Sequence, residues 1–395
     1  MTVPEVVTTS SALADIAGEA RRNGAFGIDT EFMREKTYRA KLCLVQIASG
    51  TSISIVDPLA GVDFQPIADL LADPTVEVVV HAGRQDLELF HDEFSVVPTH
   101  VFDVQVAAGF AGHGASLSYG ALVKNVVDVT LTKGESYTDW CRRPLTEKQK
   151  RYAADDVRWL LQAAAALKEK LERLGRLQWA LEEMEPLGSE STYRADLDEV
   201  WRRVSGRGGL SGRGLAALRE LARWREETAM RRNLPRGWVM KDATLVDVAR
   251  RQPNSTEALT RIRGFNAKEA ERSGAAILQT LERARSADAP NTLPPPPRED
   301  QVRTRLIGGL ADVVVRTRAE AAGVAPELVA TRGDIESLLF QLFAGRRKAS
   351  NGELDHRLLR GWRKELAGDA IVALAEGRVG VRGIDHPPYV EEVEV

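Results

Sequence analysis

The stretch GAFGIDTEF (24–32) is predicted to form a β-strand, and it carries two acidic residues, Asp29 and Glu31, among apolar neighbours. Side chains two residues apart on a strand point to the same face, so both carboxylates project from one side of the sheet. Two like charges that are partly buried side by side repel each other unless a cation neutralises them. The stretch therefore predicts an early strand and, on its surface, a cation site.

Strands and helices alternate through the first half of the chain. The predicted strands are 25–32, 42–48, 52–57 and 76–81, and the predicted helices between and after them are 64–73 and 83–94. The first three strands are joined by short connections, which favour hairpins over crossovers. A fourth strand that follows a helix indicates an α/β domain with a mixed sheet flanked by helices.

From about residue 116 the pattern becomes helical. The strongest predicted helix covers 144–174, where Thr146 and Gln149 have the spacing of a capping box. The acidic tail YVEEVEV (389–395) is expected to be mobile.

Composition divides the chain further, and 395 residues are enough for two or three domains. A Pro-rich, semi-rigid linker is predicted at 286–300. We expect an α/β domain at 1–190 and two small all-α helical bundles at 212–286 and 301–378. The bundles have similar patterns, which is consistent with degenerate repeats or with two unrelated bundles.

The charge distribution is uneven although the net charge is only −3. Residues 201–286 contain 19 Lys and Arg against 9 Asp and Glu, which leaves −13 on the remainder. A basic unit joined to an acidic one suits a polyanion that one part holds and the other processes. A solvated Arg-rich surface would give the same count.

The expected location is the cytoplasm. The N-terminus lacks a basic segment followed by an apolar one, so no signal peptide is predicted, and the longest near-apolar run, LLQAAAAL (160–167), is too short to span a bilayer. Two cysteines, Cys43 and Cys141, are too few for a disulfide framework or a cysteine-based zinc site. A reducing compartment is therefore expected.

Three further residues extend the acidic pair. Asp86 stands early in the predicted helix 83–94, and Tyr152 and Asp156 are four residues apart on one helical face. Asp155 points away from the apolar stripe and is expected to be solvated. Taken alone, Asp86 would be a surface acid at a helix start, and Tyr152 with Asp156 an amphipathic helix border.

Taken together, the four carboxylates predict a site for hard cations. Oxygen ligands without a Cys/His cluster favour Mg²⁺ or Mn²⁺ over zinc. Two such ions about 4 Å apart can clamp the attacking and leaving oxygens of a phosphodiester. We therefore expect Asp29, Glu31, Asp86 and Asp156 to bind two divalent cations, with Tyr152 orienting the attacking water.

The same residues carry a resemblance to a known family. FGIDTEF, HAGRQDLELF and YAADDV resemble the three motifs of the DEDD superfamily of 3′→5′ exonucleases, in the tyrosine variant, since position 151 is Arg and the histidine variant needs His there. The longer runs DTEFMREKTYRAKLCLVQIA (29–48) and LTKGESYTDWCRRPLTEKQKRYAADDVRWL (131–160) resemble ribonuclease D. The resemblance covers roughly residues 5–185 and, more weakly, the rest.

The resemblance implies a ribonuclease H-like fold for the first domain, with Asp29, Glu31, Asp86 and Asp156 as metal ligands and Tyr152 as the water-positioning residue. It also implies that 212–286 is an HRDC domain, the helical nucleic-acid-binding domain shared by RecQ-type helicases and ribonuclease D, and that 301–378 is a divergent second copy. The implied activity is trimming of structured RNA, notably tRNA precursors, from a single-stranded 3′ end. No membrane and no obligate protein partner are expected.

Five residues near the motifs are candidate substrate contacts: Phe32, Met33, His81, Lys133 and Arg143. Phe32 and Met33 would stack or wedge against the terminal base, and Lys133 and Arg143 would hold phosphates. Phe32 is equally compatible with a core position, and His81 with a hydrogen bond to the backbone.

The residues alone are also consistent with two other functions. A DNA exonuclease would have the same cleavage site, and a non-catalytic RNA-binding adaptor would keep a relict of it.

Overall fold

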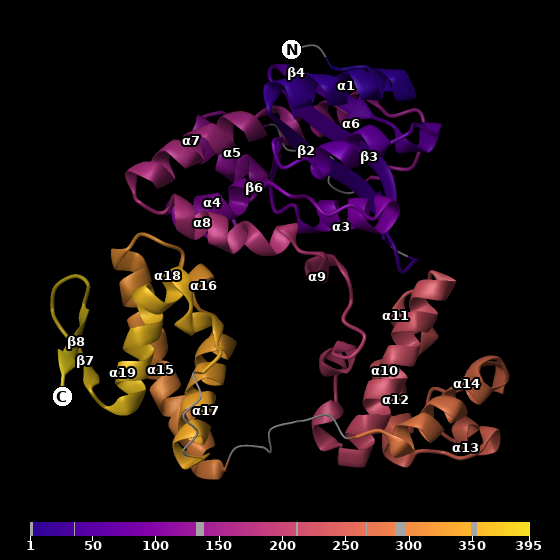
Figure 1. The fold of residues 1–395 in the computed structure, drawn as a ribbon, viewed down its shortest axis with the longest axis vertical. Coiled ribbons are helices and arrows are strands. Elements are labelled where there is room, and N and C mark those ends of the chain that lie inside the picture. Colours follow the sequence, from indigo (N-terminus) through magenta and orange to yellow (C-terminus); the bar gives the residue numbers. More distant parts are fainter. Residues whose placement is uncertain are drawn as a thin grey trace.

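The structure of the protein is a computed structural model that describes residues 3–34, 36–131, 138–210, 212–265, 267–288, 297–348 and 354–395. Figure 1 shows an N-terminal α/β domain and two helical units that both lie on one side of it. We call residues 212–288 the first helical unit and residues 297–376 the second helical unit. No helix in the described part of the chain has both the length and the apolar character needed to cross a membrane.

The N-terminal domain is built on a six-stranded mixed sheet, as predicted. The strand order is β1-β4-β3-β2-β5-β6; β3 is antiparallel to both β2 and β4, and the other neighbouring pairs are parallel. The strands are β1 (Val6–Val7), β2 (Ala25–Met33), β3 (Lys41–Ser49), β4 (Ser52–Val56), β5 (Glu77–Val80) and β6 (Val101–Asp103). The edge strands β1 and β6 were not predicted, because two and three residues carry no readable alternation.

Helices cover both faces of this sheet. Phe26, Ile28 and Ile47 point to the face covered by α1 (Ser10–Asn23), α2 (Gln65–Leu71) and α3 (Arg84–Phe94). The opposite face packs against α6 (Glu147–Arg158) and α7 (Leu160–Arg173), where Leu44 contacts the α6 alanines. The remaining helices of the domain are α4 (Val104–Phe110), α5 (Tyr119–Val127), α8 (Leu177–Met184) and α9 (Glu190–Tyr193).

The single helix predicted for 144–174 is two helices. The capping box of Thr146 and Gln149 begins α6, but Trp159 interrupts the helix before α7. The Trp159 backbone N–H donates a hydrogen bond to the Tyr119 hydroxyl at 3.2 Å. The local sequence pattern does not predict this tertiary contact. The break lies three residues beyond Asp156, which therefore stands in the last turn of α6.

A β-bulge lies next to the acidic pair. Glu31 pairs with Leu44 and Phe32 with Leu42, which leaves Cys43 of β3 unpaired. The Cys43 carbonyl accepts a hydrogen bond from Arg143 at 2.6 Å, and its sulfur is joined to Cys141 in a disulfide that the sequence did not predict. Bulges bend a strand and redirect side chains, so this one contributes to the aim of Glu31.

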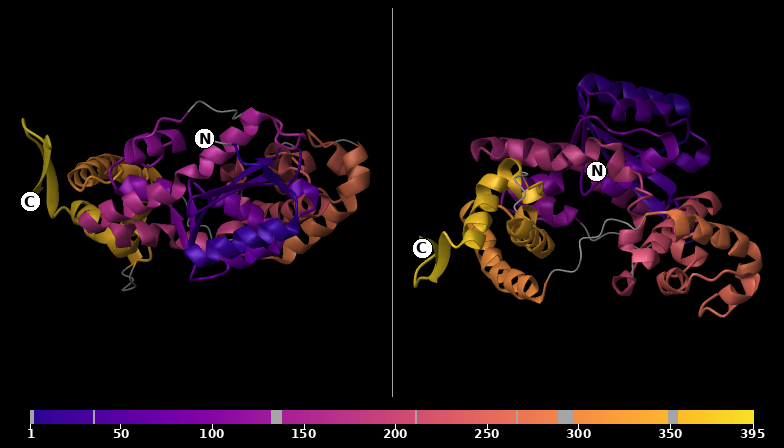
Figure 2. Two further views of the ribbon diagram at one scale, coloured as in Figure 1. Left: turned by 90° about the horizontal axis from the view of Figure 1, so that it is seen from above. Right: turned by 60° about the horizontal axis from the view of Figure 1, so that its bottom comes forward.

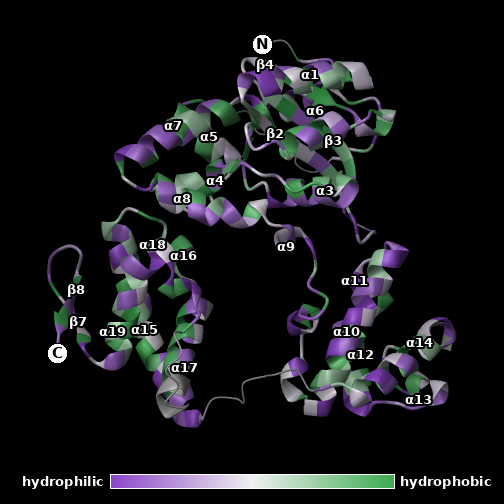
Figure 3. Cartoon of the chain, viewed as in Figure 1, coloured by the Kyte–Doolittle hydropathy of each residue, from purple (hydrophilic) through white to green (hydrophobic). Residues whose placement is uncertain are grey.

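The first helical unit contacts the N-terminal domain through the loop between β2 and β3. The unit contains α10 (Gly212–Arg232), α11 (Arg236–Val239), α12 (Asp242–Arg251), α13 (Thr256–Thr260) and α14 (Ala267–Ser286). Tyr38 packs against its core and donates to the buried carboxylate of Glu226 at 2.5 Å. Figure 3 shows hydrophilic residues along much of α10 and α11.

The second helical unit shares a hydrophobic core with the N-terminal domain. It contains α15 (Arg298–Ala321), α16 (Pro326–Val329), α17 (Arg332–Lys348), α18 (Gly361–Arg363) and α19 (Asp369–Glu376). Trp362 packs on Phe110 and Trp179, with ring centroids 5.0 and 5.6 Å apart. At Gly109 an added Cβ would lie 2.5 Å from the Leu328 side chain, so glycine allows this close approach.

The C-terminal tail forms a strand, although the sequence analysis expected no regular structure there. β7 (Val379–Gly383) and β8 (Val390–Glu394) form an antiparallel hairpin at one end of the molecule (Figure 2). Arg318 forms an ion pair with Glu392, so the acidic residues of the tail meet a basic partner on α15.

Candidate active site

Three carboxylates from two elements converge on one point. Asp29 and Glu31 project from the end of β2, and Asp156 projects from the last turn of α6. One carboxylate oxygen from each lies within 4.8 Å of those of the other two. The neighbouring Asp155 instead forms an ion pair with Arg158 at 2.8 Å and lies outside this set.

Asp86 borders this set from the first turn of α3, where it is buried. Its carboxylate accepts a hydrogen bond from the Thr30 hydroxyl, and Thr30 stands between Asp29 and Glu31 on β2. The strand therefore fixes the position of the fourth acid as well as carrying the first two. Asp86 also adds repulsion to both Asp29 and Glu31, which places its charge beside theirs.

The turn that delivers Asp86 is held by another buried acid, Asp103. Its carboxylate accepts from the backbone N–H groups of Ala82 at 3.1 Å and Gly83 at 3.0 Å, and it caps α4. Ala82 has a φ of 53°, a left-handed conformation that needs such support. Sequence reasoning missed Asp103; the signal available was an acid at the end of a short apolar run.

The electrostatics of the site favour neutral carboxyls or a bound cation. Burial, followed by repulsion from Asp156 and Asp86, raises the pKa of Glu31 to about 8. Burial raises the pKa of Asp156 to about 7 and that of Asp86 to about 6. The pKa of Asp29 is raised well above its usual value by burial and then by its three acidic neighbours.

These residues fit a hard divalent cation. The converging donors are carboxylate oxygens, with no Cys or His among them, which is the ligand chemistry of Mg²⁺ and Mn²⁺. A cation would also offset the burial that raises the four pKa values and the mutual repulsion that adds to it at Asp29 and Glu31.

Tyr152 lies on the same helical face as Asp156. Its hydroxyl donates a hydrogen bond to the Asp156 carboxylate, which lowers the pKa that burial raises. The Tyr152 ring lies 5.9 Å from the Trp140 ring, and Met33 packs against the same cluster. The phenol is therefore held beside the carboxylates by both a hydrogen bond and packing.

The remaining candidate contacts have different surroundings. His81 contacts the Leu117 carbonyl through Nε2 at 2.9 Å and packs edge-on against Tyr119, which matches the backbone-bonded alternative. Phe32 is half-buried after the bulge, where Leu42 pairs with it. Lys133 lies outside the described residues.

The expectation that Arg143 holds a phosphate is corrected. Its Nε and Nη2 donate to the Asp57 carboxylate at 2.5 and 2.7 Å, Nη2 also donates to the Cys43 carbonyl, and Nη1 donates to the carbonyls of Trp140 and Arg142. These bonds use all five N–H donors of a guanidinium, so none remains for a ligand. Arg143 instead fixes the segment before α6 against β3.

Tyr119 is a second residue that the sequence analysis missed. Its ring packs edge-on against His81, and its hydroxyl accepts a hydrogen bond from the Trp159 N–H. Burial raises the pKa of Tyr119, and the nearby charges of Asp156 and Asp29 raise it further. It therefore lies at the border of the carboxylate cluster, beside the helix break.

Comparisons with known proteins agree with this geometry. A family model described as 3′-5′ exonuclease matches residues 4–172, and the HRDC domain model matches residues 214–281. The ribonuclease D of Granulibacter bethesdensis is 38% identical over 97% of this chain and 95% of its own, and that of Acidiphilium cryptum is 37% identical over 96% and 94%.

A solved structure extends the likeness to the whole fold. The crystal structure of Escherichia coli RNase D, described as an exoribonuclease involved in structured RNA processing, matches with a TM-score of 0.81 and 32% identity over 95% of this chain and 99% of that chain. The resemblance drawn from three motifs is thus confirmed across both helical units. The chain belongs to the ribonuclease D family of 3′–5′ exoribonucleases.

Proposed function

We propose that this chain trims the 3′ ends of structured RNA, with tRNA precursors as the substrate class, and releases nucleoside 5′-monophosphates by two-metal-ion hydrolysis. The observation that carries the proposal is the convergence of Asp29, Glu31 and Asp156 within 4.8 Å, with Asp86 beside them. So dense a set of partly buried acids is stable only with protons or cations to balance it. Mg²⁺ or Mn²⁺ supplies that balance at neutral pH.

The four carboxylates are the proposed ligands. When bound, two divalent cations would supply a deprotonated water and neutralise charge on the departing 3′ oxygen. Tyr152, held by Asp156 through its hydroxyl, would position the attacking water with an oxygen lone pair. Met33 and Phe32 stand at the end of β2, where the terminal base would lie.

The helical units are proposed to hold the folded part of the RNA. We assign the exonuclease domain to 1–190, the first HRDC-like domain to 212–286, and a second, divergent one to 301–378. The repeated order of a long helix, a four-residue helix and another helix in α10–α12 and α15–α17 supports the second assignment. The excess of Arg and Lys in 201–286 supports contact with phosphates.

Product analysis on a 3′-extended tRNA precursor tests the function. With Mg²⁺ or Mn²⁺ the protein should release 5′-monophosphates from the 3′ end, and EDTA should stop the reaction. Asp156→Asn should lose cleavage, whereas Asp155→Asn, one residue away and outside the cluster, should keep it.

Other outcomes would overturn the proposal. Faster degradation of a single-stranded DNA overhang than of the RNA would indicate a DNA exonuclease. RNA binding without cleavage under any divalent metal would indicate an adaptor. Equal effects of the two asparagine variants would refute the assignment of Asp156.

A further inference from the structure

A groove of about 720 Å³ lies between the N-terminal domain and the first helical unit. Its walls are the loop between β2 and β3, the outer face of α3, the chain around α9, and the ends of α10 and α11. Figure 1 shows α11 below α3, with α9 beside them. The contact of Tyr38 with Glu226 closes one part of the groove and holds its two sides together.

The groove is rich in exposed arginines. Its lining includes three acids. Glu226 is bonded to Tyr38 and Arg236, Glu88 pairs with Arg34, and Asp92 interacts electrostatically with Arg39 and Arg34. The exposed basic residues that line it are Arg34, Arg39, Arg84, Arg194, Arg203 and Arg236. The excess of positive charge favours a polyanionic ligand.

Two of these arginines lie next to metal-ligand candidates in the chain. Arg34 follows Glu31 by three residues, and Arg84 precedes Asp86 by two. Three residues of extended chain cover about 10 Å, so the groove begins within a nucleotide or two of the carboxylates. The same two elements that carry the acids therefore continue into its walls.

Free donors and an aromatic surface are both available. The guanidinium group of Arg203 has no hydrogen bond or ion pair to the residues that the structure describes, and that of Arg39 has only an electrostatic attraction to Asp92. Trp238, on the same short helix as Arg236, is 61% exposed. Charged grooves with exposed aromatic rings are typical of single-stranded nucleic-acid binding.

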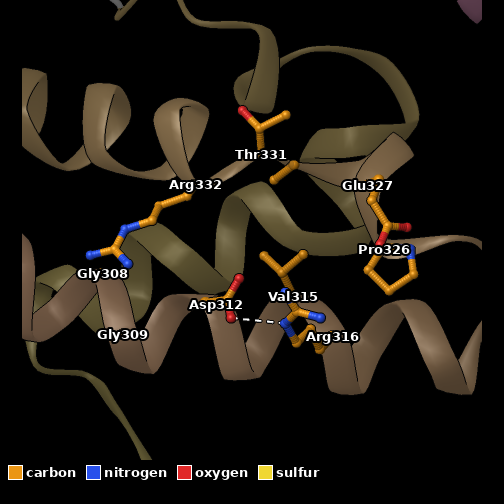
Figure 4. Close-up of a pocket in the computed structure, with 10 residues that line it drawn as sticks. Gly308, Gly309, Asp312, Val315, Arg316, Pro326, Glu327, Thr331 and Arg332 are labelled. Carbon is orange, nitrogen blue, oxygen red and sulfur yellow. Dashed lines mark hydrogen bonds and ion pairs between the residues drawn. The ribbon is translucent and has the colours of Figure 1, made fainter.

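The arginines of the groove differ from those that line a hollow in the second helical unit (Figure 4). That hollow, of about 380 Å³, is lined by Arg316 and Arg332, but Arg316 is paired with Asp312 and Arg332 with Glu336, each at 2.8 Å. Its arginines are balanced within the fold, so an anion would have to displace an acid there.

We propose that the groove holds the sugar–phosphate backbone of the single strand upstream of the 3′ nucleotide being cleaved. The inference rests on the proposed exoribonuclease function and adds the path by which RNA reaches the first helical unit. Arg39, on the loop between β2 and β3, and Arg203, on the chain before α10, bind phosphates, and Trp238 stacks on a base that leaves the groove.

The test compares RNA of two lengths and two double variants. Arg39→Ala/Arg203→Ala removes two groove charges, and Arg22→Ala/Arg173→Ala removes two exposed charges from α1 and α7 as the matched control. Binding of a single-stranded RNA of about 15 nucleotides is measured in EDTA across a salt series. Cleavage with Mn²⁺ is measured on that RNA and on a trinucleotide, which reaches only the start of the groove.

For the groove variant we expect the slope of log Kd against log salt to fall by about 1.4, because each single-strand phosphate contact contributes about 0.7. The advantage in kcat/KM of the long RNA over the trinucleotide should fall about tenfold or more, and the control variant should match wild type in both measurements. An unchanged slope and length advantage, with both RNAs cleaved by wild type, would refute the groove and leave the exoribonuclease function standing. Failure of wild type to cleave either RNA would refute the function itself.

Discussion

Replacing Glu31 by Gln should stabilise the metal-free protein while abolishing its activity. Glu31 is packed beside Asp29 and Asp156, and in the folded state its pKa is raised from 4.5 to about 8, first by burial and then by repulsion from Asp156 and Asp86. A glutamine has nearly the same shape and carries no charge, so it removes the repulsion without opening a cavity.

The size of this stabilisation follows from the difference between the pKa of Glu31 in the folded and unfolded states. One pKa unit corresponds to about 1.4 kcal/mol, so the full shift sets an upper bound of about 5 kcal/mol. The side chain is partly exposed and the acids of the cluster share their repulsion, so we expect about 2–3 kcal/mol, or roughly 4–12 °C in the melting temperature of a domain of this size.

The difference in stability between Glu31→Gln and wild type depends on pH within a defined window. Because the pKa of Glu31 is higher in the folded state, the folded protein holds the proton more tightly than the unfolded chain between pH 4.5 and about 8. Wild type therefore loses stability as the pH rises through that window. The variant should match wild type near pH 4.5, with its advantage growing to a plateau above pH 8.

Melting temperatures in EDTA from pH 4.5 to 8.5 provide the measurement. Glu147→Gln is the matched control, since Glu147 is 71% exposed and its ion pair among the described residues is a surface pair with Lys150, worth less than about 1 kcal/mol. A Glu31→Gln protein that is less stable than wild type at pH 8, or a difference that does not grow with pH, would refute the account of charge repulsion.

Three further predictions concern catalysis and RNA binding. Asp29→Ala should abolish cleavage yet leave the Kd for RNA in EDTA within about twofold, as measured by anisotropy; retained cleavage would refute the metal assignment. Tyr152→Phe should lower kcat about 10- to 100-fold with little change in KM, since the lost hydroxyl acts on the attacking water; a change confined to KM would contradict that role. Reversing the charge of Arg231 and Arg232 with Glu, in the last turn of α10, should weaken RNA binding and reduce its salt dependence by a slope of about 2 or more; unchanged affinity across salt would exclude this helix end from the interface.

The sequence predicted those parts of the fold that depend on local pattern. The alternation in β2 to β5 and the capping box at Thr146 are written in neighbouring residues, and the structure has both. The break at Trp159 and the strand in the tail depend on distant partners, Tyr119 and Arg318, which no local pattern reveals. The packing of the second helical unit against the N-terminal domain through Trp362 likewise depends on partners that are distant in the sequence.

The candidate site divides in a similar way. Asp29 and Glu31 could be placed on one face by strand alternation, and helical spacing distinguished Asp156 from Asp155. Asp103 holds the turn before α3, and Thr30 is hydrogen-bonded to the Asp86 side chain. Only the three-dimensional structure connects these two residues with Asp86.

We propose that Asp29, Glu31, Asp86 and Asp156 together bind two divalent cations. Anomalous diffraction from crystals soaked in Mn²⁺ tests it directly. We predict two anomalous peaks about 4 Å apart among these four carboxylates, and their loss in crystals of Asp29→Asn. A difference map without a peak between these side chains at saturating Mn²⁺ would contradict the claim.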